Sequence, residues 1–407
     1  MLRSYDHLET RAPEQRSADL VEALPRQIRQ AMAAAPGLAA HLAGVDPDAV
    51  VDRAALARLP VLRKSGLAAA QADAPPFGGF ATRPASDMDH VFQSPGPIYE
   101  PGRRGQDWWR LGRFLHACGI GRGDIVQNCF SYHLTPAGLM FESAAEAVGA
   151  AVLPAGTGQT ELQVQAARDV GTTAYAGTPD YLKVILEAAD AAGVRLMIVK
   201  AAVSGGALFP ALRAAYAERG IACLQCYATA DLGLIAYESQ GGEGMIVDEG
   251  VVVEIVRPDG GEPAPDGEVG EVVVTTLNPD YPLVRFATGD LSAVLPGPSP
   301  CGRTNMRITG WMGRADQTAK IRGMFVRPEQ VAALVARHPE VLRARVIADR
   351  MGEQDMLLVR VEAASADAAA IEASVRAVLK LRGGVEVVAP GSLPNDGKVI
   401  EDRRTYS

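Results

Sequence analysis

The sequence contains no apolar segment long enough to span a membrane. Of its 407 residues, 48% are hydrophobic and 22% are charged, which is the balance of a globular protein. No apolar run approaches the roughly 18 residues that a membrane helix needs. The first residues, MLRSYDHLETRAPEQ, lack the basic and then apolar order of a secretory signal. We therefore expect a cytoplasmic protein with no membrane partner.

An excess of positive charge is also missing. The chain has 40 Lys and Arg against 48 Asp and Glu, which gives a formal net charge of -8. No cluster of basic residues interleaved with aromatic residues interrupts this balance, so nothing attracts a nucleic acid backbone. Nucleic acid is therefore not an expected partner. A small anionic substrate stays compatible with the sequence, because a few well-placed cations are enough to bind it.

Cysteine is scarce, and its spacing does not indicate a metal site. The five cysteines should be thiols in the cytoplasm. Cys223 and Cys226 form a C-x-x-C pair inside the apolar segment IACLQCYA, which is typical of a buried strand. Residues three apart on a strand point to opposite faces. Because no second C-x-x-C and no His-x-x-x-His follow, we interpret the pair as structural rather than as a zinc or redox site.

The order of helical and strand patterns predicts two domains of different class. Residues 15–75 are rich in Ala and Leu with helical spacing, and residues 106–236 alternate between strands and helices. That alternation indicates a mainly parallel sheet covered by helices. Residues 244–297 change to short β-rich segments with turns, which predicts a small β subdomain. We expect a large α/β domain at 1–312 and a small α+β domain at 313–407.

Five segments, spread over almost the whole chain, resemble phenylacetate-CoA ligases of the adenylate-forming superfamily. They are LARLPVLRKSGL, with PPFGGF after it, near the N-terminus; FSYHLTPAGLMFESAAEAVGAAVLPAGTGQTELQ; CYATADLGLIAYE in the place of a Y-G-x-[ST]-E motif; VRFATGDLS, which matches R-[YF]-x-T-G-D, with ITGWMGRADQTAKIRG, which matches a G-R-x-D hinge; and SLPNDGKVIEDRR. The order and spacing of these segments carry the resemblance more than any one of them.

The resemblance implies a nucleotide site made from separate motifs. Asp290 would accept hydrogen bonds from the two ribose hydroxyls of ATP, and Arg314 would reach the same ribose and the phosphate. Taken alone, Asp290 is better explained as a turn residue after glycine, and only the company of Arg314 favours the ribose role. The remaining nucleotide-binding candidates are Gly205, Gly206, Ala207 and Tyr227. The two glycines would let the backbone lie flat against adenine, although a Gly-Gly pair is more often a plain loop.

The resemblance also implies the catalytic groups and the hinge. Thr229 and Asp231 stand where the family has a hydroxyl and a glutamate; Thr229 would touch the α-phosphate, and Asp231 would hold Mg2+. Lys398, after the flexible turn N-D-G, would place a positive charge between the substrate carboxylate and the α-phosphate. Asp316 would be the hinge about which the small domain rotates. Without the resemblance, Lys398 and Asp316 would be interpreted as solvated surface residues.

The implied reaction activates a carboxylic acid in two steps. An aryl acid resembling phenylacetate or benzoate would attack the α-phosphate of ATP, and coenzyme A would then displace AMP from the acyl-adenylate. The acid pocket would be formed by the side chains after one strand and the loop after the next, namely Phe130, Tyr132, His133, Gly156 and Thr157. A homodimer is compatible with the family, but no segment identifies an interface.

One segment departs from the pattern. Where the superfamily has a phosphate loop rich in Ser, Thr and Gly that ends in lysine, this chain has SPGPIYEP, from Ser94 to Pro101. Three prolines remove backbone donors, and Glu100 adds a charge of the same sign as the phosphates. Losing two hydrogen bonds to a charged group would weaken ATP binding by roughly 10^2 to 10^4. Arg103 and Arg104, just downstream, are candidates for compensation.

Zinc is not expected, because only Cys301 corresponds to the cysteine and histidine ligands that some relatives use. Two other functions remain open. The acceptor could be a carrier protein or an amine, because the adenylation groups would be the same. Alternatively, the altered loop could mark a catalytically impaired relative that binds a nucleotide or acyl group without turning over ATP.

Overall fold

The computed structural model describes residues 4–94, 97–105, 107–257, 261–317, 319–322, 324–351, 354–394 and 398–404. The chain forms two compact units, each described here by itself. The first unit comprises Met1–Thr288 and Ser292–Trp311, and the second comprises Gly289–Leu291 and Met312–Ser407. The second unit resumes at Met312, one residue before the predicted start of the small domain at residue 313.

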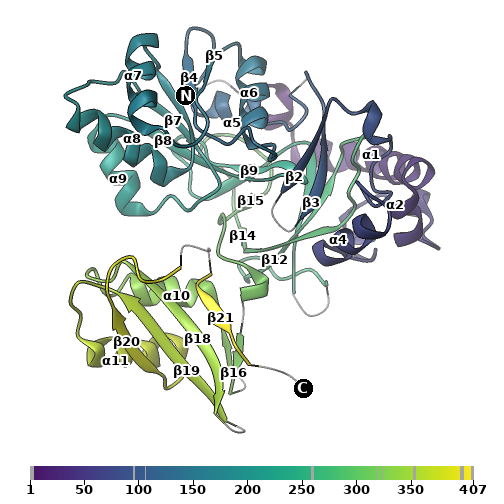
Figure 1. The fold of residues 1–407 in the computed structure, drawn as a ribbon. Coiled ribbons are helices and arrows are strands. Elements are labelled where there is room, and N and C mark those ends of the chain that lie inside the picture. Colours follow the sequence, from purple (N-terminus) through teal and green to yellow (C-terminus); the bar gives the residue numbers. More distant parts are fainter. Residues whose placement is uncertain are drawn as a thin grey trace. The chain divides into compact units, whose positions relative to one another are not determined.

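The first unit is built around a nine-stranded sheet with helices on both faces (Figure 1). In spatial order its strands are β14 (Val294–Leu295), β15 (Arg307–Ile308), β10 (Met245–Val247), β9 (Gly233–Tyr237), β8 (Ala222–Thr229), β7 (Lys200–Val203), β6 (Ala174–Gly177), β4 (Ile125–Asn128) and β5 (Ala151–Pro154). From β8 to β5 the neighbouring strands are parallel, which confirms the predicted α/β class. The remaining pairs in this sheet are antiparallel.

Two groups of helices bury the faces of this sheet. The helices are α5 (Gly112–Ala117), α6 (Ala137–Val148), α7 (Thr160–Val170), α8 (Pro179–Ala191) and α9 (Pro210–Glu218). Phe114 of α5 and Phe141 of α6 belong to one hydrophobic cluster, whereas Leu182 of α8 and Tyr216 of α9 belong to another. The separate clusters are the two sides of a parallel sheet that is covered on both faces.

A second sheet of the first unit has four strands in the order β1 (Leu62–Arg63), β13 (Phe286–Ser292), β12 (Gly270–Thr276) and β11 (Val251–Val256). The predicted β subdomain supplies three of them. β1 corrects the prediction that residues 15–75 are only helical, because Leu62 pairs in parallel with Phe286, more than 200 residues away. Such distant pairing overrides a local helical pattern.

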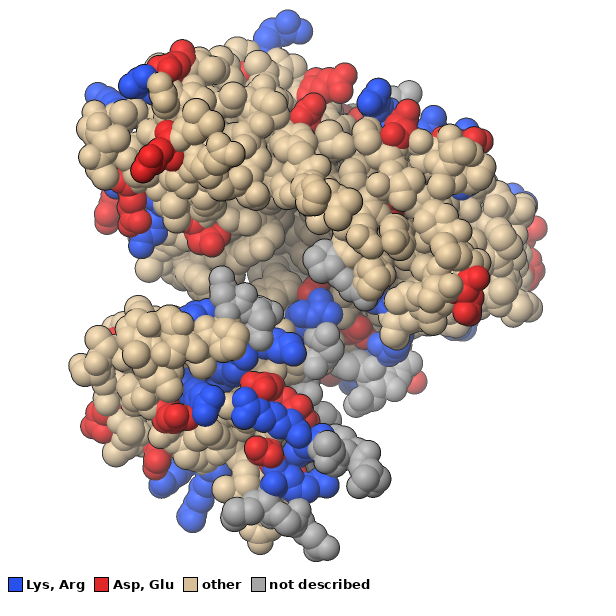
Figure 2. Space-filling model, viewed as in Figure 1, with Lys and Arg blue, Asp and Glu red and all other residues tan. Residues whose placement is uncertain are grey.

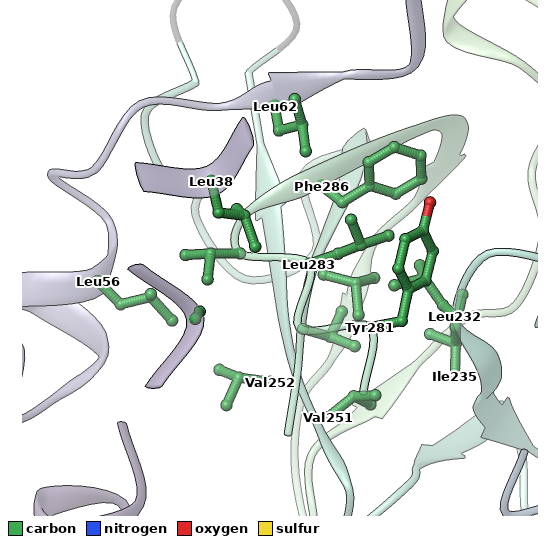
Figure 3. Close-up of a cluster of buried hydrophobic side chains, with 14 of the residues drawn as sticks. Leu38, Leu56, Leu62, Leu232, Ile235, Val251, Val252, Tyr281, Leu283 and Phe286 are labelled. Carbon is green, nitrogen blue, oxygen red and sulfur yellow. The ribbon is translucent and has the colours of Figure 1, made fainter. Parts of the chain in front are cut away.

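The N-terminal helices pack on that sheet. They are α1 (Pro13–Ala34), α2 (Pro36–His41), α3 (Arg53–Leu56) and α4 (Lys64–Asp73), with short 3-10 turns η1 (His7–Thr10), η2 (Pro47–Ala49) and η3 (Ala85–Asp87). Figure 3 shows part of the resulting core, in which leucines from the helices and from β1 lie beside residues of the sheet: Leu38, Leu56, Leu62, Val251, Val252, Leu283 and Phe286. No helix in the described part of the chain has the length and apolarity to cross a membrane.

The second unit is a small α+β structure. A four-stranded sheet in the order β20 (Gly384–Val388), β19 (Gln354–Glu362), β18 (Arg343–Met351) and β21 (Ile400–Asp402) accompanies α10 (Pro328–Val335) and α11 (Ala368–Leu379). A 3-10 turn, η4 (Ala315–Gln317), and a hairpin of β16 (Ala319–Ile321) and β17 (Met324–Val326) precede them. The elements expected after residue 313 are therefore present.

One face of the second unit carries many Lys and Arg side chains interleaved with acidic ones (Figure 2). Within the second unit, ion pairs join the two signs: Arg343 with Glu362, Arg350 with Asp355, Arg403 with Glu401, and Arg404 with Asp355 and Asp402. Several basic side chains of this unit are therefore matched by nearby carboxylates.

Candidate active site

Most predicted site residues of the first unit follow the carboxyl ends of parallel strands. β8, β7, β6, β4 and β5 run in one direction, so the segments that follow them emerge at one edge of the sheet. This edge is where open α/β sheets bind ligands. Phe130–His133 follow β4, Gly156 and Thr157 follow β5, Gly205–Ala207 follow β7, and Thr229 ends β8. The structure therefore gathers these candidates at one edge.

Asn128, which the sequence analysis did not single out, joins the two loops of the predicted acid pocket. Its buried side-chain amide donates to the Tyr132 hydroxyl and to the Gly138 carbonyl, both at 2.8 Å. The backbone carbonyl of Asn128 accepts a hydrogen bond from the backbone amide of Gly156 at 2.9 Å. Burial raises the pKa of Tyr132, and Glu142 adds to the rise. Asn128 thus fixes both loops, while His133 and Thr157 are exposed.

Phe130 lies between the predicted acid pocket and the predicted adenine loop. Its ring stacks on Phe141, with centroids 4.4 Å apart and planes at 22°. A Cβ at Gly205 would come within 3.8 Å of the Phe130 ring, and Gly205 has a φ of +70° that side chains rarely adopt. Gly206 accepts at its carbonyl from Gln225 Nε2 at 2.8 Å. Ala207, the next residue of the loop, is partly exposed.

The end of β8 differs from its predicted role in one detail. Counted from Tyr227, the hydroxyl position of Y-G-x-[ST]-E falls on Ala230, so the placement of Thr229 at that position is wrong by one residue. Thr229 Oγ1 accepts from the Leu232 amide at 3.2 Å and so shapes the turn that presents Asp231. Tyr227 is largely buried, with 8% of its surface exposed, and packs in the core.

An acidic pair and a lysine meet next to this turn. Asp231 is 5% exposed, and its Oδ2 accepts from Lys64 Nζ at 3.0 Å, while its Oδ1 has no hydrogen-bond partner among the described residues. Glu100 is fully buried, and within the described chain neither carboxyl oxygen has a partner of normal geometry. Burial raises the pKa of Glu100 to about 8, and the Asp231 charge contributes, whereas Ser94 and Lys64 act in the opposite direction. Glu100 is therefore largely protonated at pH 7.

The SPGPIYEP segment forms part of a β-hairpin, although Pro95 and Gly96 lie outside the described residues. β2 (His90–Ser94) pairs with β3 (Ile98–Gly102), and this pairing holds Glu100 opposite Phe92. Arg103, a predicted compensating cation, lies 3.4 Å from Asp280 and 3.8 Å from Asp89. Because two carboxylates already engage Arg103, Lys64 is the better-placed cation near Asp231.

In the second unit, Asp290 and Arg314 come together as predicted. They form an isolated antiparallel β-bridge, and Arg314 Nη1 lies 3.5 Å from Asp290 Oδ1. Gly289 suits this position because its φ of +76° is one that side chains rarely adopt, and a Cβ there would also lie 2.8 Å from Arg314 Nη2, the flexible end of that side chain. The glycine of the R-[YF]-x-T-G-D motif thus leaves space for the arginine side chain of the G-R-x-D motif.

The first residue of the same motif has a structural role that sequence reasoning missed. Arg285 is 2% exposed and donates to Glu254 Oε2 at 3.1 Å and to the Gly261 carbonyl at 2.8 Å. It also donates to the Leu59 carbonyl. A buried guanidinium with these partners ties the N-terminal helices to the four-stranded sheet.

Lys398 lies on the exposed segment that precedes β21, directly after residues 395–397, which are not described. The amide of Val399 donates to Gln317 Oε1 at 2.9 Å, so this segment is held beside the turn η4. Asp316 is the middle residue of η4, but its side chain lies outside what the structure describes. The predicted catalytic lysine and the predicted hinge are therefore neighbours within the second unit.

The cysteines follow the structural interpretation. Cys223 and Cys226 on β8 pack into different hydrophobic clusters, which confirms that they face opposite sides of the sheet. All five cysteines are free. The described residues contain no group of three or more His, Cys, Asp or Glu that could hold a metal ion. The expected lack of zinc stays a prediction.

Comparison with known proteins gives the family. The chain is 32% identical over 339 residues to the phenylacetate-coenzyme A ligase of Thermus thermophilus, covering 79% of this chain and 75% of the relative. It is 31% identical over 336 residues to the enzyme of the same name from Aromatoleum evansii, with 78% and 74% coverage. The chain belongs to the phenylacetate-CoA ligase family. No family model matches it.

Solved structures agree with membership of the phenylacetate-CoA ligase family. A 2-hydroxyisobutyryl-CoA ligase, in the postadenylation state with an acyl-AMP, superposes with a TM-score of 0.84 at 26% identity, covering 98% of this chain and 92% of that one. The protein is accordingly an AMP-forming acid-CoA ligase: it adenylates a carboxylic acid and forms its CoA thioester. The expected substrates, namely ATP, coenzyme A and a small-molecule acid, are consistent with membership of this family.

Proposed function

We propose that the protein activates an aryl carboxylic acid resembling phenylacetate or benzoate. The observation that carries this proposal is the position of Phe130, which follows β4 at the carboxyl edge of the sheet and stacks on Phe141 of α6; both rings are largely buried. An aromatic substrate ring that contacts Phe130 would gain about 0.5 to 1.5 kcal/mol beyond its buried area. Tyr132, His133, Gly156 and Thr157 complete the pocket in this proposal, and Asn128 keeps their two loops in register.

Two sets of residues are the proposed ligands of the nucleotide. Asp290 accepts from the ribose hydroxyls, and Arg314, held beside it at 3.5 Å, contacts the ribose and phosphate. Adenine lies along Gly205, Gly206 and Ala207, with Tyr227 below them. Support comes from the positive φ of Gly205, which leaves the loop backbone uncovered for close approach.

Asp231 is the proposed ligand of Mg2+, and the chemistry of the site fits that ion. Mg2+ prefers oxygen ligands and commonly takes one or two carboxylates together with substrate phosphates and water. Asp231 Oδ1 is buried without a partner among the described residues, so this carboxylate oxygen is available to the ion. When bound, the ion would neutralise charge on the phosphates of ATP.

Lys64 supplies the positive charge that the SPGPIYEP segment lacks. Its ammonium lies 3.0 Å from Asp231, and 38% of its side chain is exposed, so it is accessible to an anionic ligand. Near Asp231, Lys64 can contact the β- or γ-phosphate, which AMP does not have. A lysine at the start of α4 thereby replaces part of the usual phosphate loop.

The chemistry then proceeds in two half-reactions. The acid carboxylate attacks the α-phosphate and expels pyrophosphate, with Lys398 placing a positive charge between the two anionic groups. The domain at 313–407 then rotates about Asp316, which withdraws Lys398 and admits the thiol of coenzyme A. The thiol displaces AMP and forms the thioester. The cytoplasm remains the proposed compartment.

A pyrophosphate-release screen tests this proposal. The protein is incubated with Mg-ATP and a panel that includes phenylacetate, benzoate and 2-hydroxyisobutyrate, and each reaction is repeated with coenzyme A, an amine or a carrier protein as acceptor. We expect release with an aryl acid and a thioester only with coenzyme A. A product formed only with an amine or carrier protein would favour the second acceptor class. No release with any acid, together with measurable AMP binding, would identify an impaired relative.

A further inference from the structure

Cys301 lies in a polar environment that none of the other cysteines shares. It precedes β15, on the turn that follows β14, and its Sγ is 3.1 Å from Ser299 Oγ. Arg303 Nη1 donates to the same sulfur at 3.6 Å. Hydroxyl and guanidinium donors stabilise a thiolate relative to a thiol. Cys118, Cys129, Cys223 and Cys226 are instead buried, and burial raises the pKa of each thiol; the sulfur of Cys129 contacts an acceptor, Gln163 Oε1, which does not stabilise a thiolate.

The donors around Cys301 are built into the fold. Arg303 is 6% exposed, its Nε lies 3.1 Å from Glu9 Oε1, and its guanidinium carbon is 5.8 Å from the centre of the Tyr237 ring. Arg303 Nη2 and the hydroxyl of Ser239, a residue that is 5% exposed, are buried and have no partner of normal geometry in the described chain. Arg303 Nη2 is therefore an already desolvated donor on a side chain that contacts the sulfur, and the Ser239 hydroxyl is a second donor near it.

The site is open on one side. An open groove of about 790 Å³ is lined by Ser239, Gly242, Pro298 and Pro300, next to the partly exposed Cys301. Gly242 lies near both serine hydroxyls, since a Cβ there would be in ordinary van der Waals contact with Ser239 Oγ at 3.5 Å and with Ser299 Oγ at 3.8 Å. Cys301 does not line the groove, but it is itself partly exposed, so a small solute can reach this residue from solvent.

We propose that Cys301 is an oxidation site that reacts with hydrogen peroxide or small organic peroxides. The thiolate attacks one peroxide oxygen, an S–O bond forms as the O–O bond breaks, and the leaving hydroxide or alkoxide takes a proton from water. Sulfur is oxidised by two electrons to sulfenic acid, and the peroxide is reduced. Arg303 and Ser239 then stabilise the new oxygen. This inference does not rest on the proposed acid substrate.

The electrostatics agree with this reactivity. Burial opposes ionisation of Cys301, but hydrogen bonds from Ser239, Ser299 and Arg303 outweigh it and lower the pKa of the thiol from 9.0 to about 7. The charged and titratable groups behind Arg303 are Glu9, Arg113 and Tyr237. About half of the Cys301 side chains are therefore thiolates at neutral pH.

Trapping with dimedone tests the proposal on the full chain. The protein is treated with hydrogen peroxide and dimedone from pH 5.5 to 9, and peptide mass spectrometry measures the labelling of each cysteine. We expect Cys301 to be labelled at least about tenfold faster than the other four, with a midpoint near pH 7. Equal labelling of all five, or a midpoint near 9, would overturn the proposal.

Two variants separate the local donors from general stability. Ser299→Ala removes one donor and should raise the midpoint of Cys301 labelling while the melting temperature stays the same. Ser17→Ala, at an exposed position of α1, is the matched control and should leave the midpoint unchanged. A Ser299→Ala protein with an unchanged midpoint would contradict the role assigned to these donors.

Discussion

Replacement of Glu100 by glutamine should stabilise the protein in a pH-dependent way. Burial raises the pKa of Glu100 from 4.5 to about 8, so the folded state retains a proton that the unfolded chain loses above pH 4.5. The wild-type protein therefore loses stability as pH rises from 4.5 to 8. The difference between a pKa of 4.5 and one of about 8, at 1.36 kcal/mol for each tenfold change in proton affinity, corresponds to at most about 5 kcal/mol.

Glutamine has nearly the same shape as glutamate but does not ionise. The pH-dependent loss of stability should therefore disappear in Glu100→Gln. Urea unfolding at pH 5, 7 and 9 measures it. The variant should match the wild type at pH 5 to within about 1 kcal/mol and exceed it by several kcal/mol at pH 9. Glu218→Gln, at an exposed position of α9, should show no such trend. A stability difference between Glu100→Gln and wild type that does not grow with pH would refute the reasoning.

Three further changes test other parts of the account. Arg285→Met leaves Glu254 buried and unpaired and should cost about 3 to 5 kcal/mol in urea unfolding, whereas Arg257→Met, which breaks an exposed pair, should cost under about 1 kcal/mol. Lys64→Ala should weaken ATP binding about 10- to 100-fold in calorimetry and leave AMP binding nearly unchanged; equal losses for both nucleotides would contradict contact with the β- or γ-phosphate. Lys398→Ala should lower adenylation by orders of magnitude while thioester formation from supplied acyl-AMP persists; equal adenylation by both proteins would remove Lys398 from the mechanism.

The sequence predicts what depends on local pattern. The alternation of residues 106–236 gave the parallel sheet, since strand and helix periodicities are local. The faces of Cys223 and Cys226 follow from strand geometry in the same way. The meeting of Asp290 with Arg314 was expected from the family motifs, and the structure adds only the reason for Gly289 between them.

What the sequence does not reveal depends on distant contacts. β1 forms because Leu62 pairs with Phe286, and a two-residue strand leaves no periodic signal of its own. Arg285 is the first residue of the R-[YF]-x-T-G-D motif, and the motif does not indicate a structural role. Its burial against Glu254 and Leu59 is visible only in three dimensions. The pairing of Lys64 with Asp231 joins residues 167 positions apart, so no spacing rule could anticipate it.

A competition experiment tests the central claim most directly. Equal concentrations of phenylacetate and 2-hydroxyisobutyrate are supplied with Mg-ATP and coenzyme A, and the thioesters are quantified by mass spectrometry. If Phe130 contacts the ring of an aryl substrate, phenylacetyl-CoA should exceed 2-hydroxyisobutyryl-CoA by at least about tenfold, which corresponds to 1.4 kcal/mol of discrimination. A mixture dominated by 2-hydroxyisobutyryl-CoA would contradict the aryl assignment.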